Sequence, residues 1–269
     1  MLGGGFSGGL GESDYIANIK IEGVIFEDDH RSKLLAEIAN EKSIKAVIIE
    51  INSPGGGIVG SEILFNDLSL IAKNKPTVVL MDSLAASGGY MAAIASDHII
   101  AHNGTLTGSI GVLMQVAEVT ELADKIGVKF NSYKSSPIKG SPSPFEKSSP
   151  MIEAVMKESI LDSYKFFSDL VKKQRAEKLN KSLEKEIFDG RIFTGRQALQ
   201  AGLVDEIGGK DQAIKYLTAK LQNKNLPVED IELIDKKEKI FDRIFGIIPF
   251  FKEAKVASQS SNKIMAIMR

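Results

Sequence analysis

The sequence predicts an α/β fold with parallel strands. Short runs of β-branched residues alternate with segments whose apolar residues recur at helical spacing, in the order strand, helix, strand, helix, strand. The second of these strands ends in a glycine-rich turn, residues 52–57. A chain of 269 residues with 43% hydrophobic residues is long enough to bury one large core. This alternation is typical of parallel strands joined by right-handed helical crossovers.

The first hundred residues supply most of the predicted sheet. The apolar patterns predict strands over 16–26, 46–51, 77–81 and 99–101, and helices over 31–39 and up to residue 73. Ile63, Leu64, Leu68 and Ile71 fall on one face of the second helix, and Pro76 ends it. We therefore expect the third strand to start just after this proline.

The second half has a different composition. Residues 135–150 contain four prolines and six serines, which predicts a long exposed loop after a strand-like stretch at 128–133. The patterns further along predict helices over 151–173 and 179–187, a short helix starting near Thr194 or Gly195, and a final core strand over 203–205. We expect a flexible glycine-rich segment at 1–14, one α/β domain over 15–235, and a tail at 236–269 with an apolar patch at 240–251.

Composition excludes several functional classes. Thirty-four basic and thirty-five acidic residues leave almost no net charge, so we expect no nucleic-acid partner. The absence of cysteine excludes disulfides, a cysteine-ligated zinc ion and a thiol nucleophile. Glycines 55–57 lack the spacing and the lysine of a phosphate-binding loop, so we expect no nucleotide, metal or other cofactor. No stretch approaches the roughly 20 apolar residues that span a bilayer, and the start lacks the pattern of a signal peptide.

The strongest candidate for chemistry is Ser87. It lies in the sequence Ala-Ala-Ser-Gly-Gly-Tyr, where the strand at 77–81 leads into a segment of small residues. A serine at such a junction is open to a substrate, and the N–H of Gly88 at the start of a helix is a natural donor to an oxyanion. A second donor is expected from Gly55 or Gly56, because turns after neighbouring parallel strands meet at one edge of the sheet. The alternative is a packing site that tolerates only small residues.

A nucleophilic serine needs a base. A histidine base would be His30, His98 or His102 with a carboxylate behind it, but His98 follows Asp97 and is interpreted as a surface residue that opens a strand. A lysine base has an unperturbed pKa near ~10.4 and must be desolvated to be neutral at pH 7. Lys134 and Lys139 lie in the loop, where each has the alternative of being a solvated surface lysine.

Several motifs occur together in a fixed order. They are Ser-Pro-Gly-Gly-Gly at 53–57, Ala-Ser-Gly-Gly-Tyr at 86–90, Leu-Thr-Gly-Ser-Ile-Gly-Val at 106–112, Tyr-Lys-Ser-Ser-Pro-Ile-Lys at 133–139, Asp-Gly-Arg at 189–191 and Gly-Leu-Val-Asp at 202–205. In this set the chain resembles the signal peptide peptidase A family, also called protease IV, in its short single-domain bacterial form. The resemblance covers roughly residues 16–220.

The resemblance implies roles for particular residues. Ser87 would be the nucleophile, Lys139 the general base, and Ser109 the hydroxyl that orients this lysine. The oxyanion donors would be the backbone of Gly88 and that of Gly55 or Gly56. The lysine loop departs from the family pattern at Ser136, where glycine is usual, and at Gly140, where an acidic residue is usual.

The resemblance also implies a fold and a setting. The fold would be the spiral of ββα units shared with Clp proteases and crotonases, with a helical extension. The protein would be a ring-like homo-oligomer whose serine and lysine come from neighbouring subunits, on the outer face of the cytoplasmic membrane in the bacterial cell envelope. It would cut cleaved signal peptides and other membrane-derived or unfolded peptides without ATP or a cofactor. The alternatives are a crotonase-like acyl-CoA enzyme and a non-catalytic oligomeric membrane scaffold.

Overall fold

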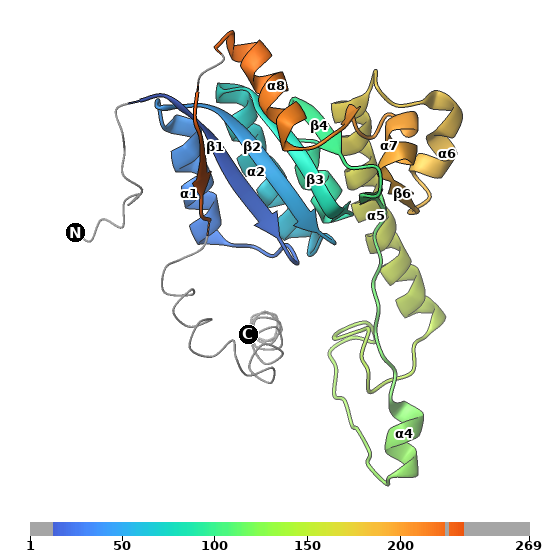
Figure 1. Ribbon diagram of the computed structural model, residues 1–269. Coiled ribbons are helices and arrows are strands. Elements are labelled where there is room, and N and C mark those ends of the chain that lie inside the picture. The colour runs from blue at the N-terminus through green and yellow to red at the C-terminus, as the bar shows by residue number, and fades with distance from the viewer. Residues whose placement is uncertain (1–12, 224–225, 234–269) are drawn as a thin grey trace, which may run out of the picture.

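An eight-stranded sheet lies at the centre of the molecule in the computed structural model, which describes residues 13–223 and 226–233 (Figure 1). The strands are β1 (Tyr15–Glu22), β2 (Ile44–Ser53), β3 (Thr77–Ala86), β4 (His98–Ala101), β5 (Leu106–Gly108), β6 (Ile192–Thr194), β7 (Glu206–Ile207) and β8 (Val228–Ile231). The helices are α1 (Asp29–Asn40), α2 (Ile58–Asn74), α3 (Gly88–Ala93), α4 (Thr120–Lys125), α5 (Pro150–Arg175), the 3-10 helix η1 (Lys181–Leu183), α6 (Glu184–Ile187), α7 (Gly195–Ala201) and α8 (Lys210–Leu221).

The sheet forks at β3. Its first half, from Val78 to Met81, pairs with β4, and its last residues, from Leu84 to Ala86, pair with β5. The main path runs β6-β5-β3-β2-β1-β8, while β7 extends the branch at β4. The described pairings are parallel except that between β5 and β6. The fork brings the carboxyl ends of β3 and β5 to the same edge of the sheet.

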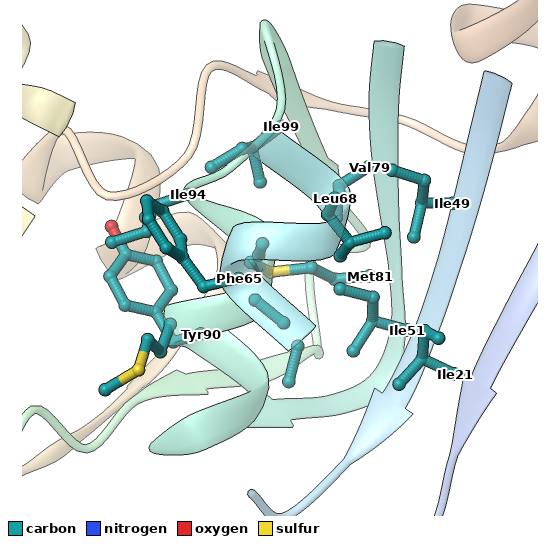
Figure 2. Close-up of a cluster of buried hydrophobic side chains, with 14 of the residues drawn as sticks. Ile21, Ile49, Ile51, Phe65, Leu68, Val79, Met81, Tyr90, Ile94 and Ile99 are labelled. Atoms are coloured by element: carbon teal, nitrogen blue, oxygen red, sulfur yellow. The ribbon is translucent and has the colours of Figure 1, made fainter. Parts of the chain in front are cut away.

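Helices cover both faces of the sheet. Buried residues of α1 and α2 form one cluster with the strands, and Ala213 and Leu217 of α8 form a second cluster on the other face. Figure 2 shows part of the first cluster, in which Leu68 of α2 lies beside Val79 of β3 and Phe65 of α2 lies beside Tyr90 of α3. A central strand with both faces covered has apolar residues at consecutive positions. This explains why residues 46–49 of β2 are all apolar and all buried.

The structure confirms the predicted α/β class and most elements of the first half. The first strand ends at Glu22, four residues before the predicted end. The short helix begins at Gly195 with Thr194 as its N-cap, as predicted. The predicted amino-terminal segment, apart from residues 13 and 14, and the tail at 236–269 lie outside the described residues.

Two predicted strands are wrong. Residues 128–133 form no strand, because this apolar stretch has no neighbouring strand to pair with, and Tyr133 is 97% exposed. The strand near this position is β7 at Glu206–Ile207, so Leu203 and Val204 are buried in the turn before it, and β8 follows later in the chain. Their burial explains why the sequence there resembles a core strand.

Residues 112–149 form an arm that leaves the body near the sheet edge, and α5 leads the chain back (Figure 1). The arm exposes many large apolar side chains, namely Leu113, Met114, Val116, Leu122, Ile126, Val128, Phe130, Tyr133 and Phe145. Within the described residues, no helix has the length and apolarity needed to cross a bilayer.

Candidate active site

Ser87 occupies the sharp junction between β3 and α3. Its backbone angles, φ 54° and ψ −119°, lie in a region that residues with a side chain rarely adopt. The residue is half-buried, and its hydroxyl forms no hydrogen bond with any described residue. Strained conformations of this kind persist only where the surrounding structure enforces them.

Helix α3 is held firmly behind this serine. Tyr90 is fully buried and its hydroxyl donates to the carbonyl of Leu203 at 2.9 Å. Burial raises the pKa of the Tyr90 phenol well above its usual range, so the group stays a neutral donor. Gly89 allows close packing, because a Cβ there would lie 2.9 Å from the carbonyl oxygen of Ser53. Ser87 therefore sits on a rigid support.

The N–H of Gly88 is a free donor beside Ser87. The carbonyl of Ser87 accepts from the N–H of Met91 at 2.9 Å within α3. Because a trans peptide places C=O and N–H on opposite sides, the Gly88 N–H points out of the start of the helix. It has no acceptor among the described residues. Such an N–H favours negative charge.

A second free donor is the N–H of Gly56. The carbonyl of Gly55 accepts from the N–H of Ile25 at 2.9 Å, so the Gly56 N–H in the same peptide points away from Ile25. No described residue accepts from it. The N–H of Gly55 instead donates to Ser53 Oγ at 3.0 Å. Of the two glycines predicted as the second donor, only Gly56 therefore has its N–H available.

The two free N–H groups are neighbours. A Cβ built on Gly88 would lie 3.2 Å from the nitrogen of Gly56. A Cβ built on Gly55 would lie 2.6 Å from the nitrogen of Gly88 and 3.0 Å from Ser87 Cβ. No side chain fits between the turn and the helix, so the glycine turn lies directly against the backbone of Ser87 and Gly88.

Ser109 lies beside Ser87 at the fork of the sheet. Ala86 pairs with Gly108, and the N–H of Ser87 donates to the carbonyl of Gly108 at 2.9 Å. Ser109 also has a positive φ, 51°, and its N–H donates to the carbonyl of Arg191 at 2.8 Å. Two half-buried serines thus follow paired residues at one edge of the sheet. The Ser109 hydroxyl forms no hydrogen bond with a described residue.

The two candidate lysines lie in the arm and differ in their surroundings. Lys134 pairs with Glu146 and lies 3.5 Å from Ser141 Oγ. The hydrogen bond from Lys134 lowers the pKa of the Glu146 carboxyl. Lys139 is exposed, and its ammonium has no hydrogen bond or ion pair with any described residue. The structure therefore gathers Ser87, the glycine donors and Ser109 but does not bring Lys139 into contact with them within one chain.

None of the three histidines forms a hydrogen bond with Ser87 in the described part of the chain. His98 pairs with Val78 at the amino end of β3, nine residues before Ser87, which is more than ~20 Å at the usual rise of a strand. Its ring stacks on Tyr216 and its Nε2 lies 3.2 Å from Glu206. His30 and His102 are exposed. In the described part of the chain, no cluster of three histidine or acidic residues is suited to hold a metal ion.

Sequence reasoning missed Ile25 as a contributor to this site. Ile25 was expected only as part of the first strand, but it forms an isolated bridge with Gly56 beyond the end of β1. The available signal was Gly23, which interrupts the apolar run and has a positive φ of 73°. This glycine ends the strand and lets residues 24–26 turn toward the glycine-rich loop.

The chain is similar in sequence to known and putative proteases. The sequence pattern described as Peptidase family S49 matches residues 69–224, which include Ser87, Ser109 and Lys139. A putative protease of Synechocystis is 33% identical over 86% of this chain and 83% of its own length. A putative signal peptide peptidase SppA of Enterococcus faecium is 38% identical over 68% of this chain, and the chain spans 53% of that relative.

A solved structure shows the same fold. A mutant of the 1510-N membrane-bound stomatin-specific protease, in complex with a substrate peptide, aligns with a TM-score of 0.52 at 18% identity. The alignment covers 86% of this chain and 98% of that chain. Fold and sequence together define the class of the molecule as a serine peptidase. The chain belongs to peptidase family S49.

Proposed function

We propose that the chain is an ATP-independent serine endopeptidase with a Ser-Lys dyad formed by Ser87 and Lys139. The observation that carries this proposal is the placement of Ser87 beside two free N–H groups, those of Gly88 and Gly56. Donors preorganised in this way stabilise the negative oxygen that develops when a serine attacks a carbonyl. The motif match to family S49 around Ser87 supports the same role.

Lys139 is the proposed base. An exposed lysine is almost entirely protonated at pH 7, so it needs a desolvated environment before it can accept a proton. Lys139 is exposed within one chain, and the arm around it also exposes apolar side chains. A second copy of the chain that covers the arm would supply this environment, and Ser109 would orient the neutral amine. The free ammonium of Lys139 supports this choice over Lys134, which is paired with Glu146.

The proposed reaction is acyl transfer in two steps. The Lys139 amine takes the proton of Ser87 Oγ as this oxygen attacks the scissile carbonyl, and the resulting oxyanion accepts from Gly88 and Gly56. The Lys139 ammonium then protonates the leaving amine, and the peptide bond breaks to leave an acyl-enzyme. A water molecule gives its proton to Lys139 and attacks the ester, which releases the acid and restores the Ser87 hydroxyl.

The proposed substrates are cleaved signal peptides and other membrane-derived or unfolded peptides, and the proposed location is the outer face of the bacterial cytoplasmic membrane. The name of the Enterococcus faecium relative supports the first part. A ring-like homo-oligomer with shared sites is part of the same proposal, supported by the exposed apolar arm. The family match favours this reading over an acyl-CoA enzyme or a scaffold.

The test is hydrolysis of an unfolded protein and a fluorogenic peptide panel without ATP or metal. We expect Ser87→Ala and Lys139→Ala each to lower kcat by at least ~100-fold with unchanged oligomer size, because each removes a reacting group. Lys129→Ala is the matched control, since Lys129 is another exposed lysine of the arm. Full activity in Lys139→Ala would overturn the dyad, and full activity in Ser87→Ala would overturn the serine mechanism.

A further inference from the structure

Two buried serines, Ser53 and Ser61, lie on either side of the glycine turn at residues 55–57. Neither is one of the reacting groups described above. We propose that Ser53 and Ser61 are positioning residues that hold the N–H groups of Gly56 and Gly88 in the geometry that binds the oxyanion. This inference rests on the proposed function, because it assigns a role to the supports of the two donors.

Ser53 fixes the turn from the β2 side. The residue is fully buried, and its hydroxyl oxygen accepts from the N–H of Gly55 at 3.0 Å. This bond orients the peptide before Gly55, while the bond from Ile25 to the carbonyl of Gly55 orients the next peptide, which carries the Gly56 N–H. Because a hydrogen bond holds each of these two peptides, Gly55 keeps its φ of 94° and the N–H of Gly56 stays directed away from Ile25.

Ser61 fixes the turn from the α2 side. It is 1% exposed, and its hydroxyl donates to the carbonyl of Gly57 at 2.9 Å. A Cβ built on Gly88 would lie only 2.0 Å from Ser61 Oγ. The hydroxyl of Ser61 therefore contacts the Gly88 backbone and at the same time holds the residue after Gly56. It sets the spacing between the two donors.

The proposed role differs from a contribution to stability alone. The carbonyl of Gly57 also accepts from the N–H of Ser61 at 3.0 Å, so Ser61→Ala leaves this carbonyl satisfied. The variant loses only the oxygen that lies between the turn and Gly88. Hydrogen bonds weaken steeply as donors move out of line, so a small drift of either glycine weakens oxyanion binding without unfolding the chain.

The experiment measures kcat and KM per active serine, counted by covalent labelling of Ser87 with a fluorophosphonate. The variants are Ser61→Ala and Ser53→Ala, assayed in the full chain at its native oligomer size. Ser69→Ala is the matched control, because Ser69 lies in the same helix and its hydroxyl has no partner. The binding of a peptide boronate, whose adduct with Ser87 is tetrahedral, reports on the oxyanion site directly.

We expect Ser61→Ala and Ser53→Ala to lower kcat by about tenfold, less than loss of a whole oxyanion donor, with KM within about twofold of the wild type. Boronate binding should weaken by a similar factor, and Ser69→Ala should match the wild type. Since Ser61→Ala leaves no backbone group unpaired, it decides the proposal even if Ser53→Ala does not fold.

The proposal is wrong if Ser61→Ala keeps the wild-type kcat and boronate affinity per labelled serine. It is equally wrong if activity falls only in proportion to the number of serines that can be labelled, since that result means a loss of folded protein. Failure of the proposed function looks different, because the wild type itself would then neither cut peptides nor be labelled at Ser87.

Discussion

At the scale of single residues, the backbone of Ser87 is the most informative feature. Its φ of 54° with ψ of −119° belongs to a region favoured by glycine, yet a serine stands there. Such strain costs on the order of 1–3 kcal/mol. Strained backbone of this kind clusters at functional sites.

This strain predicts that Ser87→Gly is more stable than Ser87→Ala by about 1 kcal/mol, because glycine relieves the strain but loses ~0.5–1 kcal/mol through its freer unfolded state. Both variants lack the hydroxyl, so the difference isolates the backbone. Urea unfolding of the two proteins at one oligomer size measures it. Equal stability, or a more stable alanine variant, would show that Ser87 is not strained in the native protein.

At the scale of elements, α5 is held to the body by a buried ion pair at its carboxyl end. Arg175 is 3% exposed and contacts both carboxylate oxygens of Asp205, at 2.9 and 3.0 Å. Asp205 also accepts from Lys178 and from the N–H of Ile99. This network joins α5, the turn after α7 and β4, so it fixes the helix that leads back from the arm.

The network predicts a pH dependence. Burial raises the pKa of the Asp205 carboxyl, but hydrogen bonds from Arg175 and Lys178 and the charge of Arg175 outweigh it, and the net pKa is lowered. Because the pKa of Asp205 is lower in the folded protein than in the unfolded chain, the ionised carboxylate stabilises the fold. This stabilisation is fully present above the unfolded pKa of about 3.9 and is lost as the pH falls through the lower pKa of the folded state. Asp205→Asn should therefore be less stable than the wild type by about 3 kcal/mol at pH 7.

The difference between Asp205→Asn and the wild type should begin to shrink below about pH 4, where the Asp205 carboxyl of the unfolded chain becomes protonated, and it should vanish only below the lower pKa of the folded carboxyl. Urea unfolding at pH 7, 5, 4 and 3 tests this convergence. Asp169→Asn, which alters an exposed pair with Lys165, serves as the control and should follow the wild-type curve. Parallel curves for Asp205→Asn and wild type would contradict the assigned role.

At the scale of the whole molecule, the body and the arm carry different parts of the proposed site. The body holds Ser87 and its donors, whereas Lys139 lies in the arm together with the exposed apolar side chains. Exposed apolar surface of this kind usually marks an interface. The arrangement in Figure 1 thus favours a site completed by a second copy of the chain.

A shared site predicts complementation between two inactive variants. Mixed ring oligomers of Ser87→Ala and Lys139→Ala should recover about a quarter of the wild-type activity, because one site in four combines an intact serine with an intact lysine. Different affinity tags on the two variants verify that mixed oligomers form. If mixed oligomers form and remain inactive, the serine and lysine of each site come from the same chain.

The sequence by itself determined the features that depend on neighbours in the chain. Apolar spacing predicted the main strands and helices of the first half. The small residues that follow the apolar run at 77–81 predicted the strand-to-helix junction at Ser87 and Gly88. Thr194 was recognised as the start of a helix for the same reason, since an N-cap bonds to residues only a few positions away. These signals are local, so they can be read before any tertiary contact is known.

Only the tertiary structure decided the features that depend on distant partners. Gly55 and Gly56 look alike in the sequence, but the Gly55 N–H donates to Ser53 Oγ, while the bond from Ile25 to the Gly55 carbonyl leaves the Gly56 N–H pointing outward and free of any described acceptor. The pairing of β5 with β3 places Ser109 beside Ser87, although β5 is too short to recognise from its pattern. The stretch at 128–133 has an apolar pattern but no strand to pair with. In each case the outcome depends on whether a backbone group finds a hydrogen-bond partner that is distant in the sequence. The local sequence does not specify such a partner.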